Sequence, residues 1–200
     1  MGALSTATVE APAPAAEVAQ APIRWRVTGA FFTTISVWGA AMGLLSAATA
    51  HRPFSASPAV AALAQKALAG PPLLAAAVWA LALALALTVH EAGHALMARR
   101  VGSPEVEVVL GGLHGRTAYS LDDPWSLRRV LVVLSGALAP AILLPFAWAP
   151  HLMPVAVVGA LLVGINLIPM PMSDGGHLLA VAIHRLVPEE STAATLTQVV

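Results

Sequence analysis

Long apolar runs separated by short polar stretches dominate the chain. Residues 27–50, 73–98 and 130–149 are almost free of charge, and each is long enough to cross a hydrocarbon core that needs about 20 helical residues. Residues 153–168 form a fourth run of about the minimum length, and a shorter run follows at 175–187. The pattern predicts an all-α polytopic membrane protein with about four to five transmembrane helices.

The pattern changes in residues 101–123, where the chain between two predicted spans is more polar. Polar and apolar residues alternate from Glu105 to Val108, and a period of two is typical of a strand. The glycines at 111 and 112 interrupt this alternation, and residues 115–119 could return as a second strand. We therefore expect a short β-hairpin directly after the second span.

Prolines mark where the predicted helices bend or stop. Pro140 and Pro145 lie inside the third run and should kink it, as membrane helices tolerate. Pro169 and Pro171 forbid a continuous helix through residues 166–171. The backbone should therefore bend before the last apolar segment begins.

The chain outside the apolar core divides into tails and a first span. Residues 1–23 are rich in alanine and proline and predict a disordered N-terminal tail, and residues 189–200 form a C-terminal tail. Residues 24–70 hold the first transmembrane span and an external connector, which leaves 71–188 as the membrane core. Alternatively, the first run is the apolar part of a cleaved signal peptide with a small-residue cleavage site at 48–50, although the preceding tail is long and acidic for that role.

Composition restricts the class of protein further. Hydrophobic residues make up 58% of the 200 residues and charged residues 10%, which excludes an ordinary soluble domain. The formal net charge is zero, so no basic field would attract nucleic acid. The sequence contains no cysteine, so a metal site has to use histidine and carboxylate donors.

The basic residues predict how the chain is oriented in the membrane. If the spans alternate, Arg52 and Lys66 fall on one side. The other side holds Arg24, Arg26, Arg99, Arg100, Arg116, Arg128 and Arg129. Loops rich in lysine and arginine stay in the cytoplasm. We therefore expect an integral, multi-pass protein of a bacterial cell membrane with the arginine-rich side in the cytoplasm.

Candidate chemistry lies near the end of the second predicted span, where residues 90–94 read His-Glu-Ala-Gly-His. Histidines four positions apart share one face of a helix, so His90 and His94 can bind one zinc ion while Glu91 acts as a general base toward water. An ionisable group inside a lipid-spanning helix costs about 3 kcal/mol or more, which makes this cluster a candidate functional site. Arg99 and Arg100 follow closely, so the site should lie toward the cytoplasmic side.

A third metal ligand is needed, because catalytic zinc in most enzymes takes three from the protein. The metzincin extension is absent, since Met97 and Arg100 stand where its glycine and third histidine would be. Asp174 is the other acid within the apolar segments, and it follows the proline-broken stretch. We therefore expect Asp174 to be the third ligand, with N-capping of the last helix as its alternative role.

Nearby residues could support this site. Gly175 and Gly176 would let the backbone approach the metal, because glycine carries no Cβ. His114 and His177 could join the site, and we expect them to lie at its periphery or at the surface instead.

Two motifs together resemble a known family. Residues 90–94 match HExxH and residues 166–175 match NxxPxxxxDG, each in its own apolar segment. This pair resembles the site-2 protease family of intramembrane zinc metalloproteases, and the resemblance covers about residues 73–187. The site residues that it implies are His90, His94 and Asp174 on Zn2+, Glu91 as general base, and Asn166 beside the substrate backbone. It also implies a membrane-associated β-hairpin after the HExxH helix.

The resemblance implies a function and has one clear departure. The implied activity is hydrolysis of a peptide bond in a membrane-anchored protein within the lipid bilayer, and residues 105–110 could receive the unwound substrate by β-addition. No stretch is long enough for a PDZ or CBS domain, so we expect a minimal member. Residues 135–140 resemble the family's Gly-Pro-x-x-Asn run but have Ala137 and Pro140 in place of its proline and asparagine.

Two other functions stay open at this point. A membrane metallohydrolase acting on small peptides would use the same zinc chemistry. A non-catalytic zinc-binding scaffold or transporter would need the ligands alone. A transporter is expected to carry polar pairs across several spans, whereas here they converge at one depth.

Overall fold

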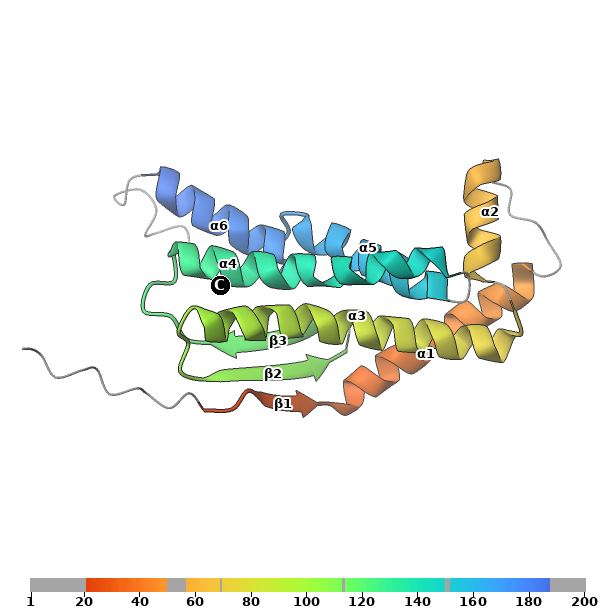
Figure 1. The fold of residues 1–200 in the computed structure, drawn as a ribbon, viewed down its shortest axis with the longest axis horizontal. Coiled ribbons are helices and arrows are strands. Elements are labelled where there is room, and N and C mark those ends of the chain that lie inside the picture. The colour runs from red at the N-terminus through yellow and green to blue at the C-terminus, as the bar shows by residue number, and fades with distance from the viewer. Residues whose placement is uncertain (1–20, 50–56, 69, 113, 150–151, 188–200) are drawn as a thin grey trace, which may run out of the picture.

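The computed structural model describes residues 21–49, 57–68, 70–112, 114–149 and 152–187. Most of its helices lie roughly along one long axis, and a small sheet lies beside one end of them (Figure 1). The helix at Pro58–Ala67 (α2) stands across this axis at the other end. The predicted tails therefore lie outside the described residues, apart from the last three positions of 1–23.

Three helices are long and apolar enough to cross a membrane. They are α1 (Gly29–Thr49), α3 (Pro72–Arg100), and α4 (Leu127–Leu138) with its continuation η1 (Ala139–Trp148). The chain is thus a helical protein with the features of a membrane protein, as the apolar runs predict.

The other helices are shorter. They are α2 (Pro58–Ala67), α5 (Met153–Leu167) and α6 (Asp174–Leu186). The apolar α5 has 15 residues, and at 1.5 Å per residue its length of about 22 Å is below the thickness of a hydrocarbon core. The predicted fourth and fifth spans therefore stay a prediction.

Close packing of α1 on α3 depends on two glycines. A Cβ added to Gly39 would lie 2.6 Å from the carbonyl oxygen of Ala76, and one added to Gly43 would lie 2.8 Å from that of Pro72. Small residues four positions apart allow two helix backbones to approach closely, which is a common way for helices to associate in lipid. This contact holds α1 against the first half of α3.

The proline-containing third run winds in two ways. It is α-helical up to Leu138 and then a 3₁₀ helix that contains Pro140 and Pro145. Proline has no N–H for an α-helical hydrogen bond, and here the change of winding to η1 follows directly from the two prolines. The sequence predicted that the prolines would disturb the α-helix, but it did not predict the 3₁₀ helix that replaces it.

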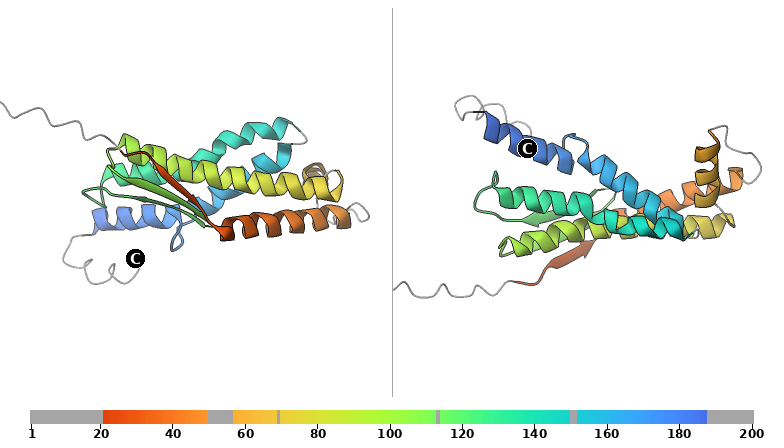
Figure 2. Two further views of the ribbon diagram at one scale, coloured as in Figure 1. Left: turned by 90° about the horizontal axis from the view of Figure 1, so that it is seen from below. Right: turned by 45° about the horizontal axis from the view of Figure 1, so that its top comes forward.

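A three-stranded sheet packs against α3. The predicted hairpin is formed by β2 (Val106–Gly111) and β3 (His114–Tyr119), which are antiparallel. The side chains of Val106, Val108 and Leu110 are buried, and the register places Tyr119, Thr117 and Gly115 opposite them. Residues that are directly opposite in a sheet share a face, so Thr117 lies on the same face as the buried Val108. The sheet lies beside α3 (Figure 2).

The third strand of the sheet corrects the prediction from sequence. Residues Arg24–Val27 form β1, which pairs in parallel with β2, whereas we expected Arg24 and Arg26 only to flank the first span and Val27 to begin it. Arg24 and Arg26 lie 3.6 and 3.4 Å from Glu105 and Glu107. The partner strand lies about 80 positions further along the chain, as the hydrogen bond of Thr28 with Leu110 shows (3.1 Å), and no local pattern reports such a pairing.

Candidate metal centre

The structure brings His90, His94 and Asp174 together. The two imidazoles lie on one face of α3 with their Nε2 atoms 3.3 Å apart. The first residue of α6 supplies the carboxylate, whose Oδ1 lies 3.3 Å from Nε2 of His94 and whose Oδ2 lies 3.5 Å from Nε2 of His90. All three residues are buried. This group can bind a metal ion.

The spacing of these donor atoms fits a metal ion better than a set of hydrogen bonds. Oδ2 of Asp174 and Nδ1 of His90 are buried without a hydrogen-bond partner among the described residues, and a buried carboxylate without compensation is costly. Corners of a tetrahedron whose centre lies about 2.0–2.1 Å away are about 3.3–3.4 Å apart. The two imidazole nitrogens have that separation, and each lies 3.3–3.5 Å from a different oxygen of Asp174. One ligand atom from each residue lies within 4.8 Å of the other two, so the three residues can share one cation.

Helix α4 orients His94. Its Nδ1 lies 2.9 Å from the carbonyl oxygen of Val132 on α4, and donation from Nδ1–H leaves the Nε2 lone pair free for a metal. The Ser135 hydroxyl donates to the same carbonyl at 2.7 Å and to the carbonyl of Gly93 at 2.9 Å. Gly136 lies against the His94 ring and leaves no room for a Cβ. These contacts fix both the tautomer and the position of the ring.

Glu91 lies between the metal donors and the sheet. Its Oε1 is 4.0 Å from Nε2 of His90, and its Oε2 accepts a hydrogen bond of 2.6 Å from the Thr117 hydroxyl on β3. The backbone of Gly115 lies against the carboxylate so closely that a Cβ would collide with it. Strand β3 therefore positions Glu91. The sequence predicted a strand at these residues but not its contact with Glu91.

The turn before α6 delivers Asp174. Ser173, and not Asp174, is the N-cap: its hydroxyl oxygen accepts from the Gly176 N–H at 3.0 Å. The alternative capping role of Asp174 is therefore wrong, because the residue before it already performs that role. Gly175 is needed for a different reason than the one predicted, since its Cβ would lie 2.7 Å from the carbonyl oxygen of Ile168. The glycine lets the turn fold on itself.

A cavity of about 300 Å³ adjoins the metal donors. His94 and Asp174 line it from one side, and Thr117, Tyr119, Arg129 and His177 are among the other lining residues. Burial raises the pKa of the Tyr119 phenol, so this group stays protonated and can donate a hydrogen bond. The cavity leaves space for a further molecule beside His94 and Asp174.

The remaining predicted residues lie outside the three-residue group. His177 lines the cavity one turn after Asp174, as a neighbour of the site. His114 begins β3 opposite Gly111, and its side chain lies outside the described part of the structure. The Asn166 amide donates to the carbonyl of Leu162 in its own helix at 2.9 Å. Its predicted role beside the substrate stays a prediction.

Comparison with known proteins adds no assignment. The chain matches neither a model of a known protein family nor a curated protein. The functional argument therefore depends on the geometry of the site.

Proposed function

We propose that this protein is an intramembrane zinc metalloprotease of the site-2 protease type. One observation carries the proposal: Asp174, which is remote in sequence, lies 3.3 and 3.5 Å from the Nε2 atoms of the two HExxH histidines, with Glu91 beside them. The two histidines and Glu91 lie on α3, one of the three long apolar helices, and Asp174 begins α6. Hydrolysis at such a place would act on a peptide bond at membrane depth.

Zinc is the metal that suits these donors. Two imidazoles and one carboxylate form the ligand set of many catalytic zinc sites, and tetrahedral zinc then keeps its fourth position open. The two imidazole nitrogens are 3.3 Å apart, which is close to the edge of such a tetrahedron, and the carboxylate lies within reach of both. When bound, zinc would supply Lewis acidity toward a water molecule and the carbonyl of the scissile peptide bond.

The surrounding residues have distinct roles in this proposal. Glu91 takes the proton from the attacking water and passes it to the leaving nitrogen. Thr117 holds the other carboxylate oxygen at 2.6 Å. Val132 holds His94 through its carbonyl. Asn166 would bind the substrate backbone after giving up its bond to Leu162.

The way a substrate strand could bind has to be revised. We expected residues 105–110 to accept it, but β2 lies in the middle of the sheet, with β1 on one edge and β3 on the other. Strand addition needs an unpaired edge. Among the described residues no strand pairs with the outer edge of β3, which lies beside the cavity to which Thr117 and Tyr119 contribute. We therefore propose addition of the unwound substrate to the free edge of β3.

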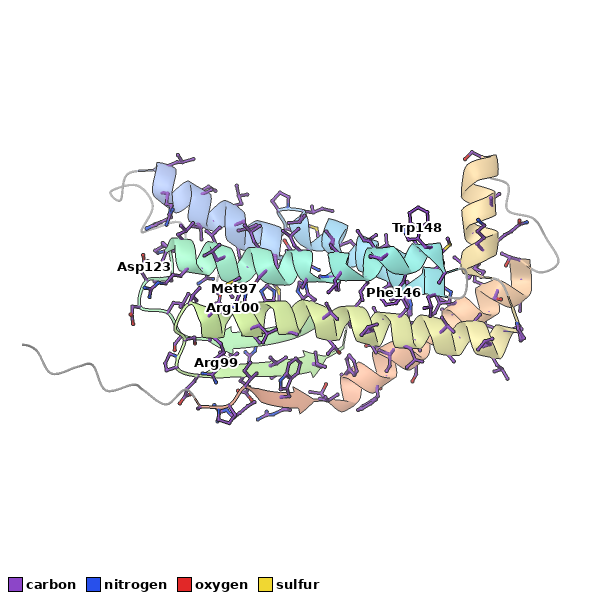
Figure 3. The ribbon with its side chains drawn as sticks, viewed as in Figure 1. Met97, Arg99, Arg100, Asp123, Phe146 and Trp148 are labelled. Carbon is purple, nitrogen blue, oxygen red and sulfur yellow. The ribbon has the colours of Figure 1, made fainter. Side chains whose placement is uncertain are left out.

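The proposed membrane orientation follows the charged end of the molecule. Arg99, Arg100 and Asp123 lie at one end, and Phe146 and Trp148 at the other (Figure 3). His94 lies roughly 9 Å along α3 from Arg100, at a rise of 1.5 Å per residue. By the positive-inside rule, the site faces the cytoplasm. The short α5 and α6 would complete four to five spans in a bilayer that is thinned around the protein.

The test compares the wild type with Glu91→Gln, both zinc-loaded and reconstituted in liposomes with single-span reporter proteins. Glu105→Gln is the matched control, because that exposed acid lies away from the metal donors and pairs with Arg24. We expect a cleavage fragment with the wild type and the control and none with Glu91→Gln. Wild type that binds zinc and cleaves no reporter contradicts the protease assignment.

The alternatives predict different results in the same assay. A metallohydrolase of small peptides would cleave a soluble peptide in a Glu91-dependent way and leave the membrane reporters intact. A scaffold or transporter would bind zinc with no hydrolysis that depends on Glu91.

A further inference from the structure

Arg129 is the cation of the cavity beside the metal donors. Among the described residues that line this cavity of about 300 Å³, it is the one with a permanent positive charge. The cavity also contains His94 and Asp174, so a molecule held by the metal would extend toward Arg129. We propose that this cavity is a subsite for a carboxylate of the peptide substrate, with Arg129 as the group that binds it. The proposal rests on the metal site of the proposed function.

The backbone of Arg129 is fixed and its side chain is poorly satisfied. It is the third residue of α4, and its N–H donates to the capping hydroxyl of Ser126 at 3.4 Å. The guanidinium makes no ion pair with a described residue, and its Nε is buried without a hydrogen-bond partner among them. A buried guanidinium nitrogen that has no acceptor is unfavourable, and a carboxylate can satisfy it with two parallel hydrogen bonds.

Other arginines near this end of the molecule differ from Arg129. Arg24 and Arg26 form ion pairs with glutamates on the sheet. The guanidinium of Arg99 donates to backbone carbonyls, and that of Arg185 donates to the carbonyl of Trp125 at 3.1 Å. Each of these four has a partner in the protein. Arg100, Arg116 and Arg128 have none among the described residues, but they are exposed to water. Arg129 is the arginine whose Nε is buried without an acceptor among the described residues, and a ligand would supply that acceptor.

Asp174 also lines this cavity, but it forms no ion pair with Arg129. Its two oxygens lie 3.5 and 3.3 Å from the imidazoles of His90 and His94. A bound metal would use the charge of this carboxylate. With a divalent cation, Glu91, Asp174 and Arg129 taken together, the site has a net positive charge and attracts an anion.

Tyr119 gives the subsite a second donor. Its phenol lines the cavity and stays protonated, so it can donate a hydrogen bond to a carboxylate oxygen. The carboxylate could belong to an acidic side chain or to a free C-terminus of the peptide. The shared chemistry is an oxyanion at a fixed distance from the metal.

The test measures binding and does not depend on hydrolysis. The protein is loaded with Co2+ in place of zinc, and the cobalt–thiolate absorption band reports binding of a thiol at the metal. Three probes differ in one group each: mercaptoacetyl-Asp-amide, mercaptoacetyl-Asn with a free C-terminal carboxylate, and mercaptoacetyl-Asn-amide. The corresponding mercaptopropionyl probes have one more methylene group, which lengthens the distance between the thiol and the carboxylate.

Controls come from the adjacent arginine. Arg128→Gln removes a positive charge at the preceding position, and Arg128 lines a different pocket together with Asp122 and Asp123. Arg129→Gln removes the proposed binding group, and Arg129→Lys keeps a charge without the planar pair of donors. The comparison of acid and amide probes on wild-type protein decides the proposal even if a variant does not fold.

We expect one of the acid probes to bind at least tenfold more tightly than the diamide, and the probe that does so identifies the source of the carboxylate. The preference should fall below twofold in Arg129→Gln, be partly kept in Arg129→Lys, and remain in Arg128→Gln. Equal binding of all three probes to wild type overturns the subsite and leaves the metal site standing, as does a preference that persists in Arg129→Gln. A cobalt-loaded protein that gives no thiolate band with any probe overturns the metal site together with the subsite.

Discussion

Replacing Thr117 with valine tests whether the sheet positions the general base. Valine has nearly the shape of threonine and lacks the hydroxyl, which donates to Oε2 of Glu91 at 2.6 Å. A hydrogen bond to a charged group contributes about 1.5–3 kcal/mol, and each 1.36 kcal/mol of barrier is about tenfold in rate. We therefore expect kcat to fall by about 10- to 150-fold in Thr117→Val.

The assay is cleavage of a single-span reporter in liposomes, with zinc content measured on the same samples. KM and zinc content should stay close to wild type, because Thr117 is not a metal donor in the site. Thr117→Ser restores the hydroxyl and should recover most of the rate. Thr33→Val is a matched control, since the Thr33 hydroxyl donates to the carbonyl of Gly29 at an exposed position of α1.

Two results would refute this reasoning. If Thr117→Val cleaves at the wild-type rate, the hydrogen bond does not position Glu91 for the reaction. If its zinc content falls with its activity, then β3 supports the metal donors and not the base.

Three further predictions address the metal site. Asp174→Asn should weaken zinc binding by about 100-fold or more, whereas Asp123→Asn, at an exposed position, should leave it unchanged. Zinc titration with a competing chelator measures both affinities, and wild-type affinity in Asp174→Asn would show that this residue is not a ligand. Gly136→Ala should lose zinc and about 1–3 kcal/mol of stability, because the added Cβ collides with the His94 ring. A Cβ added to Gly164 has no neighbouring atom within 4 Å, so Gly164→Ala should change neither the thermal unfolding nor the zinc content. Removing zinc with a chelator should lower the free energy of unfolding by about 4 kcal/mol relative to zinc at 1,000 times its Kd; an unchanged Tm would mean that the folded site does not bind the ion.

Features that depend on local spacing were predictable from the sequence. The apolar runs indicate long helices because one run of about 20 residues can satisfy its own backbone in lipid. The HExxH spacing places His90 and His94 on one helix face whatever surrounds it. The alternation from Glu105 onward predicted β2 in the same way. Each of these signals lies within a few residues of the feature that it specifies.

The sequence also named Asp174 as the third donor, from its position and from the family resemblance. Its closeness to the imidazoles is a property of how α6 packs beside α4 and α5. The same packing decides that Gly136 meets the His94 ring and that the Arg129 side chain lines the cavity. A small residue or a lone arginine near the end of an apolar run has too many ordinary explanations to be singled out in advance.

The sequence by itself therefore determined the class of protein, the helix that carries the site and three candidate ligands, because short-range periodicity and hydrophobicity encode them. Only the tertiary structure decided that Arg24–Val27 is a strand, that Thr117 holds Glu91, and that β3 has the free edge next to the cavity. These are contacts between segments distant along the chain. Their partners are selected by the packing of whole elements, which no local pattern records.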